Sequence, residues 1–176
     1  GLLAFIADSL ELKPGETKVE SFSITLNDQH GGLITKQIDV TVNGTNDAPV
    51  MATAAQSGSI TEAANNSAAE LSNVTHQATG TLAFSDVDLS DAHTVSVGGN
   101  GAPGYRGALS ANVSNGSTGD GAGAIAWTFA VADGALDDLA QDQVLTQTYS
   151  IAVNDGHGGL ASRNVVITLT GAADNT

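Results

Sequence analysis

The stretch Val42-Asn43-Gly44-Thr45-Asn46-Asp47-Ala48-Pro49-Val50 decides how this chain is organised. It ends an alternating strand and then presents two side-chain oxygen groups in succession, at Asn46 and Asp47. The proline that follows excludes helix, because the residue before a proline is restricted to extended backbone. A strand resembling the one before this stretch returns at residues 165–171. The stretch therefore indicates a junction between two copies of one module.

A hairpin pattern occurs twice in the chain. Residues 22–42 contain two runs of alternating apolar and polar side chains around an Asn-Asp-Gln-His-Gly-Gly turn, which is typical of a β-hairpin. Residues 149–160 repeat residues 22–33, with eight of the twelve aligned residues identical, and residues 165–169 follow in phase. Solenoid repeats recur every 20–50 residues or so, so the much longer spacing here indicates tandem copies of a whole domain.

The repeat predicts the domain limits. Residues 1–46 are expected to be the final strands of a preceding, incomplete repeat, with a buried strand at residues 1–7. Residues 47–176 are expected to form one complete repeat. Three strands cannot close a sandwich, because an apolar face and an edge would stay uncovered. We therefore expect the first segment to dock on a neighbouring chain or to belong to a domain whose other strands precede it.

The complete repeat reads as a series of short strands separated by turn residues. Besides the hairpin, the strand candidates are residues 58–62, 80–84, 93–97 and 126–131. One helical turn is expected at residues 135–140, and residues 98–123 read as loop-rich apart from a strand candidate at 105–110. About seven short strands with turns between them predict an all-β chain, an immunoglobulin-like or cadherin-like antiparallel β-sandwich in tandem repeat.

The composition excludes several partners. Five basic residues against nineteen acidic ones give a net charge of −14, which repels nucleic acid and anionic membranes. Carboxylate and amide oxygens are the ligands that Ca²⁺ prefers. The chain has no cysteine, so that neither a disulfide nor a thiolate metal site is possible. No apolar run approaches the ~20 residues of a membrane-spanning helix, so no membrane insertion is expected.

Acidic residues are concentrated directly after the strand that ends at Phe84. Asp86, Asp88 and Asp91 follow within seven residues, and such crowded carboxylates repel one another unless a cation neutralises them. By spacing alone, a metal site and an ordinary polar turn are equally good interpretations. Topology favours the metal, because in a seven-strand sandwich this loop returns to the end where the linker enters, and the turn at residues 154–159 lies at that end too.

This reasoning predicts two Ca²⁺ sites, each completed only by a neighbouring repeat. At the incoming linker, Asn46, Asp47, Asp86 and Asp88 would share one or more ions. At the far end of the sandwich, Glu62 would lie near the outgoing linker together with Asp174. The predicted ligands are thus Asn46, Asp47, Asp86, Asp88, Glu62 and Asp174.

Four sequence motifs, taken in order, resemble the VCBS repeat family. They are Gly-Thr-Asn-Asp-Ala-Pro (44–49), Gly-Ser-Ile-Thr-Glu (58–62), Gly-Thr-Leu-Ala-Phe-Ser-Asp-Val-Asp (80–88) and Asn-Asp-Gly-His-Gly-Gly (154–159). VCBS repeats occur in very large bacterial surface proteins, including RTX-type adhesins. The linker and the Asp-x-Asp pair also resemble cadherin junctions, which implies the same Ca²⁺ ligands. The final linker, residues 171–176, departs from the pattern, because it lacks the Asn before the Asp and the following Ala-Pro.

The resemblance implies a non-enzymatic extender repeat of a secreted bacterial surface adhesin that supports cell adhesion or biofilm formation. Its partners would be neighbouring repeats, while other domains would contact a surface glycan, a host or an abiotic surface. Catalysis is not expected, because the carboxylates cluster at strand ends and turns, and the matching His30 and His157 lie in hairpin turns that Asp28 and Asp155 are expected to cap. The alternative is a Ca²⁺-dependent glycan- or surface-binding module that would use Tyr105, the one aromatic residue with a plausible exposed position.

Overall fold

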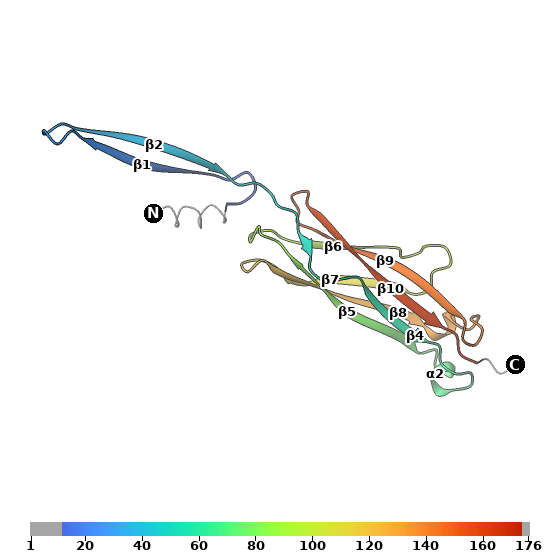
Figure 1. The fold of residues 1–176 in the computed structure, drawn as a ribbon. Coiled ribbons are helices and arrows are strands. Elements are labelled where there is room, and N and C mark those ends of the chain that lie inside the picture. The colour runs from blue at the N-terminus through green and yellow to red at the C-terminus, as the bar shows by residue number, and fades with distance from the viewer. Residues whose placement is uncertain (1–11, 174–176) are drawn as a thin grey trace. The chain divides into compact units, whose positions relative to one another are not determined.

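The computed structural model describes residues 12–173 (Figure 1). The chain divides into two compact units, Gly1–Asp47 and Ala48–Thr176, and the division falls inside the predicted junction. The strand expected at residues 1–7 and the ligand candidate Asp174 lie outside the described residues.

The first unit contains one long antiparallel hairpin, β1 (Thr17–Asn27) paired with β2 (Leu33–Asn43). At its turn, Oδ1 of Asp28 accepts the backbone N–H groups of His30 (2.8 Å) and Gly32 (2.7 Å). The predicted hairpin and the predicted cap are therefore confirmed. Most apolar side chains of both strands are exposed, and these are Val19, Phe22, Ile24, Leu26, Leu33, Ile34, Ile38 and Val40.

The second unit is a sandwich of two four-stranded sheets (Figure 1). One sheet has the order β4-β10-β9-β6 and the other the order β3-β5-β8-β7. The strands are β3 (Val50–Met51), β4 (Gln56–Thr61), β5 (Thr75–Ser85), β6 (Thr94–Gly98), β7 (Ala108–Gly116), β8 (Ala122–Ala132), β9 (Val144–Asn154) and β10 (Leu160–Thr170). A four-residue helix α2 (Ala68–Leu71) and a 3₁₀ turn η1 (Asp133–Ala135) lie in connections.

The strand order is that of an immunoglobulin-like sandwich, which confirms the predicted fold class. The first strand of such a domain is here split in two. Its first part, β3, pairs antiparallel with β5, and its second part, β4, pairs parallel with β10. All other strand pairs are antiparallel. The incoming chain thus covers one edge of each sheet.

The core lies between the sheets and is built by alternation along the strands. On β8, every second residue from Gly123 to Val131 is buried, among them Trp127 and Phe129. On β9, Tyr149, Ile151 and Val153 are buried in the same way. The indole Nε1–H of Trp127 donates to Oε1 of Gln56 (3.0 Å), which satisfies a polar group at the edge of the core.

Three local predictions differ from the structure. The stretch 98–123, expected to be largely loop, contains the nine-residue strand β7, whose Ser and Asn residues alternate with inward-facing side chains such as Leu109. The helical turn expected at 135–140 forms earlier, as η1 (Asp133–Ala135). The short helix α2, where the side chain of Ser67 accepts the N–H of Glu70 (3.2 Å), was not predicted. Secondary-structure propensity predicted these segments poorly. Pairing with β8 forms the strand β7, and the Ser67 cap stabilises the start of α2.

Candidate metal centre

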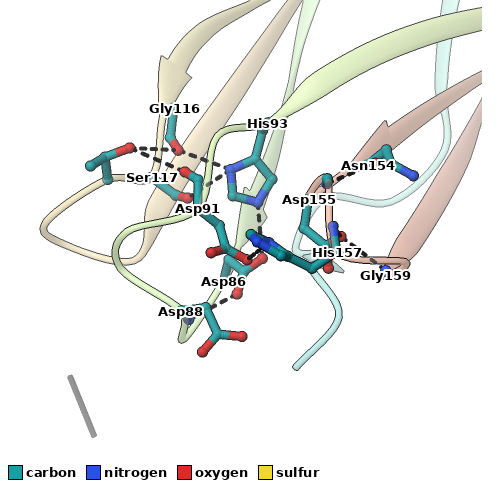
Figure 2. A network of polar contacts seen from close by, with 12 residues as sticks. Asp86, Asp88, Asp91, His93, Gly116, Ser117, Asn154, Asp155, His157 and Gly159 are labelled. Atoms are coloured by element: carbon teal, nitrogen blue, oxygen red, sulfur yellow. Dashed lines mark hydrogen bonds and ion pairs between the residues drawn. The ribbon is translucent and has the colours of Figure 1, made fainter. Parts of the chain in front are cut away.

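Three carboxylates meet at the end of the sandwich where β5 ends (Figure 2). We call Asp86, Asp91 and Asp155 the proximal cluster. One carboxylate oxygen from each lies within 4.8 Å of the other two, and all three side chains are buried. Asp86 and Asp91 come from the connection between β5 and β6, whereas Asp155 begins the turn between β9 and β10. The structure therefore confirms that these two connections lie at the same end.

Hydrogen bonds hold Asp86 in place from several directions. Its Oδ1 accepts the backbone N–H of Asp88 (2.9 Å), and its Oδ2 lies 2.9 Å from Nε2 of His93. The side chain of His93 is fully buried and packs against the ring of Phe84. Its Nδ1 faces the carbonyl oxygen of Gly116 at 3.1 Å. The Gly116 carbonyl and the Asp86 carboxylate are both acceptors, so the two ring nitrogens of His93 face acceptor oxygens on opposite sides, which orients the ring.

The turn between β9 and β10 supplies the third carboxylate. Oδ1 of Asp155 accepts the N–H groups of His157 (2.7 Å) and Gly159 (2.9 Å), which confirms the predicted cap. Nδ1 of His157 lies 3.2 Å from Oδ2 of Asp91 and links the two connections (Figure 2). Ala48, the first residue of the second unit, packs against Gly159. The incoming chain therefore enters the sandwich beside this turn.

The predicted ligands are distributed between the two units. Asp86 and Asp88 are buried at the proximal end, as predicted, while Asn46 and Asp47 belong to the first unit. That all four share an ion stays a prediction. Glu62 is buried directly after β4, and its Oε2 accepts the N–H of Ala172 (2.7 Å). This glutamate does contact the outgoing chain, two residues before Asp174.

A second acidic group lies at the opposite end of the same unit. We call Glu70, Asp133 and Asp137 the distal cluster, and one carboxylate oxygen from each lies within 4.8 Å of the others. β8 runs antiparallel to β5 with Thr75 opposite Ala132, so Asp133 lies at the start of β5 and the proximal cluster at its end. With ~3.3 Å per residue along β5, the clusters are about 33 Å apart.

Electrostatics in the distal cluster shift the pKa values of Glu70 and Asp133 in opposite directions. Contact with Asp133, then burial, then repulsion by Asp133, Asp137 and Glu62 raise the pKa of Glu70 to about 7. Burial opposes ionisation of Asp133, but the N–H of Ala63 and the ring of His76 lower the pKa of this carboxyl below its ordinary value. Asp133 is therefore the member of the pair that ionises more readily.

The sequence predictions missed part of each cluster. Asp91 was noted as a nearby carboxylate but not chosen as a ligand, and Asp155 was interpreted only as a turn cap. The signal for Asp155 was present, since its turn was predicted at the same end as Asp86. Glu70 and Asp133 carry no local motif, because they are distant in sequence and only the pairing of β5 with β8 brings them together.

Comparisons with known proteins concern the fold. No family model matches the chain, and no curated protein matches it either. Solved structures similar to it include zebrafish RET cadherin-like domains 1 to 4, with TM-score 0.40, 11% identity, and 89% of this chain and 34% of that chain covered. Mouse clustered PcdhgC3 EC1-3 gives TM-score 0.42 and 14% identity, covering 93% of this chain and 45% of that one.

A third similar structure is protocadherin gamma C5 EC1-3, with TM-score 0.37, 18% identity, and 87% of this chain and 42% of that chain covered. The chain thus spans less than half the length of each of these structures. The class of the protein rests on its own strand order: an all-β chain with an immunoglobulin-like antiparallel sandwich. No helix of residues 12–173 is long and apolar enough to cross a membrane.

Proposed function

We propose that this chain is an extender repeat of a secreted bacterial surface adhesin, stiffened by Ca²⁺ at the junctions between repeats and supporting cell adhesion or biofilm formation. The observation that carries the proposal is the proximal cluster, three buried carboxylates from two connections beside the entering chain. Buried carboxylates repel one another, and this repulsion is relieved when a cation is bound. The bacterial setting is supported by the four VCBS-like motifs.

The residues of the proximal cluster fit Ca²⁺. The donors are carboxylate oxygens, as a hard cation requires, and Asp86, Asp91 and Asp155 are held by hydrogen bonds before any ion binds. When bound, the ion would supply positive charge that neutralises the cluster. Asp86, Asp91 and Asp155 would hold it within the sandwich, and Asn46 and Asp47 of the linker would add oxygens from the preceding unit. Sharing ligands between the units would restrict the angle of the junction.

Tandem repetition is supported by the two hairpins. β1 and β2 pair with Phe22 opposite Ile38, and β9 and β10 pair with Tyr149 opposite Val165. These positions are equivalent in the aligned repeats. In the second unit the apolar face of the hairpin is covered by the other sheet, whereas in the first unit it is exposed. We infer that the first hairpin completes a preceding sandwich of the same kind, so that residues 1–46 are the end of one repeat.

The alternative function, a glycan- or surface-binding module, lacks its expected aromatic platform. The ring of Tyr105 packs edge-on against Tyr149, with ring centroids 5.5 Å apart. Its hydroxyl oxygen accepts the N–H of Thr148 (3.0 Å) and its O–H donates to the carbonyl of the same residue (3.3 Å). Because the ring and the hydroxyl of Tyr105 already contact Tyr149 and Thr148 within the domain, the structure does not favour sugar stacking at this residue.

The proposal is tested by thermal melting and small-angle scattering of residues 1–176 with Ca²⁺ and with chelator. At 100 times the dissociation constant, an ion stabilises the folded state by about 2.7 kcal/mol. For a unit of this size we expect the melting temperature to rise on the order of 10 °C. The scattering should also indicate a narrower range of unit arrangements in Ca²⁺. Identical melting and scattering in both conditions would refute the proposal.

Two variants assign the effect to the predicted residues. Asp91→Asn should remove most of the Ca²⁺-dependent rise in melting temperature, because it deletes a buried ligand charge. Replacing both Asn46 and Asp47 by Ala should reduce the Ca²⁺-dependent rise in melting temperature less than Asp91→Asn does, but should widen the scattering distribution in Ca²⁺. Asp39→Asn, an exposed change of the same kind on β2, is the matched control and should behave as the unaltered chain.

A further inference from the structure

The strand β7 lies at the edge of its sheet, because the strand order is β3-β5-β8-β7. Among residues 12–173 it pairs with β8 on one side and with no strand on the other. Edge strands present backbone N–H and C=O groups that can pair with a strand of another chain. Many proteins protect such edges with charged residues or proline, but Ala108–Gly116 contains neither. The edge of β7 therefore needs another kind of protection.

The side chain of Asn100 covers this edge at Leu109. Its Nδ2 donates to the carbonyl oxygen of Leu109 (2.7 Å), and its Oδ1 accepts the N–H of the same residue (2.9 Å). In an antiparallel ladder, the N–H and C=O groups of one residue both face the same neighbouring strand. The amide of Asn100 therefore takes the place beside Leu109 that a residue of a further strand would take.

The loop before β7 is shaped to present this amide. Gly99 and Gly101 flank Asn100 and have φ values of 104° and 74°, which glycine adopts without strain. A Cβ atom at Gly99 would lie 3.0 Å from the carbonyl oxygen of Thr148, so the loop passes close to β9. The N–H of Ala102 donates to the carbonyl of Gly99 (3.2 Å) and closes the turn. The backbone on both sides thus fixes the position of Asn100.

The regular part of the β7 edge is short. By the alternation of the ladder, the N–H and C=O groups of Ala111 face the same way as those of Leu109. Further along, the register of β7 on β8 shifts between Val113 and Asn115, which marks a β-bulge that interrupts regular pairing. Asn100 therefore closes one end of the edge, and the bulge limits the other.

We propose that Asn100 caps the β7 edge against strand addition by a second copy of this chain. Charge favours the β7 edge as the place where two copies meet. Each copy carries a net charge of −14, so two copies repel each other overall, whereas β7 contains no ionisable side chain. Antiparallel pairing of two β7 strands about a twofold axis is also self-complementary, so no other partner is required. The proposal does not depend on the function proposed above.

The variant Asn100→Ala tests the cap. At low protein concentration, hydrogen exchange at the N–H of Leu109 should become about tenfold faster, because this group loses its acceptor, while exchange on the central strand β8 should stay unchanged. At high concentration, sedimentation velocity should show a dimer about tenfold tighter than any that the unaltered chain forms. The matched control is Asn164→Ala, an exposed position on β10, which lies between β4 and β9. It should behave as the unaltered chain.

A second substitution shows where the two copies meet. Asn112 is exposed on β7, and Asn112→Glu places a carboxylate on the edge that repels an incoming acidic copy. The double variant of Asn100→Ala and Asn112→Glu should therefore be monomeric again. Unchanged exchange at Leu109 in Asn100→Ala would overturn the cap. An Asn100→Ala chain that stays monomeric, or a dimer that survives Asn112→Glu, would overturn strand addition at β7.

Discussion

Phe22 and Tyr149 occupy equivalent positions in two copies of one hairpin, but only Tyr149 is buried. Phe22 pairs with Ile38 as Tyr149 pairs with Val165. The side chain of Phe22 is 38% exposed, whereas that of Tyr149 is 0% exposed. Full burial of a large apolar side chain stabilises a fold by ~1.5–3 kcal/mol. The first hairpin therefore presents an apolar face that would gain stability if another sheet covered it.

We expect Tyr149→Ala to lower the free energy of unfolding of the second unit by about 3–5 kcal/mol, because it opens a cavity in the core. Phe22→Ala should change that free energy by less than about 0.5 kcal/mol, as exposed substitutions do. Urea denaturation of residues 1–176, followed by the fluorescence of the buried Trp127, measures both.

The same pair tests whether the first hairpin belongs to a preceding repeat. In a longer protein that includes a complete preceding sandwich, Phe22→Ala should become destabilising by an amount similar to Tyr149→Ala. If Phe22→Ala stays neutral in that longer protein, the inference that the hairpin completes a sandwich is wrong.

Gly80 on β5 lies opposite Trp127 on β8 and leaves room for its ring. A Cβ atom at Gly80 would lie 2.5 Å from Cζ2 of Trp127 and 2.7 Å from Oε1 of Gln56, so Gly80→Ala would displace the indole. We expect a loss of about 1–3 kcal/mol in unfolding free energy, typical of an overpacked core. Thermal melting measures this loss.

Gly98→Ala is the matched control for this substitution. Gly98 ends β6 with no positive φ, and a Cβ there would meet its nearest atoms at 3.9 Å. The control should be neutral or slightly stabilising, because Gly→Ala at an unstrained position reduces the entropy of the unfolded chain. Equal melting temperatures for the two variants would contradict the assigned role of Gly80.

Gln147 is fully buried on β9 and ties the loop before β7 to the core. Its Nε2 donates to the carbonyl of Arg106 (2.9 Å) and to the hydroxyl of Tyr149 (3.0 Å), and its Oε1 accepts the N–H of Arg106. Gln147→Leu keeps the volume but leaves these groups without partners, which should cost about 1–3 kcal/mol. Gln77→Leu, an exposed position on β5, should cost far less in the same denaturation experiment.

The turn of the first hairpin should depend on pH through Asp28. Hydrogen bonds from the N–H groups of His30 and Gly32 lower the pKa of this carboxyl below its ordinary value of 3.8. A lowered pKa in the folded state means that the turn is stabilised above pH 3.8 and that this stabilisation is lost as pH falls through the folded pKa. The amide shift of Gly32 should therefore titrate with a midpoint below 3.8.

Asp28→Asn is the control for the titration. The amide oxygen can still accept from Gly32, but it does not ionise, so the Gly32 signal should lose its dependence on acid. A midpoint at or above 3.8 in the unaltered chain would show that the hydrogen bonds to Asp28 do not form in solution.

Much of the fold could be predicted from local patterns. The alternation of Tyr149, Ile151 and Val153 predicted both the strand and its buried face, because side chains of a strand point to opposite sides of a sheet. The loop after Phe84 and the turn at Asp155 were predicted at one end by topology alone, and the proximal cluster confirms that placement. By contrast, most of β7 was predicted to be loop, because its small polar residues form a strand through pairing with β8.

The sequence by itself determined the repeat, the two hairpins and the residues that begin the proximal cluster, because these depend on periodicity and turn chemistry within short segments. Only the tertiary structure decided that Asp155 joins Asp86 and Asp91, and that Glu70 meets Asp133. Those residues are far apart along the chain. Their carboxylates converge because β6 pairs with β9, with Thr94 opposite Asn154, and because β5 pairs with β8. Local patterns carry no information about such convergence, since it results from the register of whole strands.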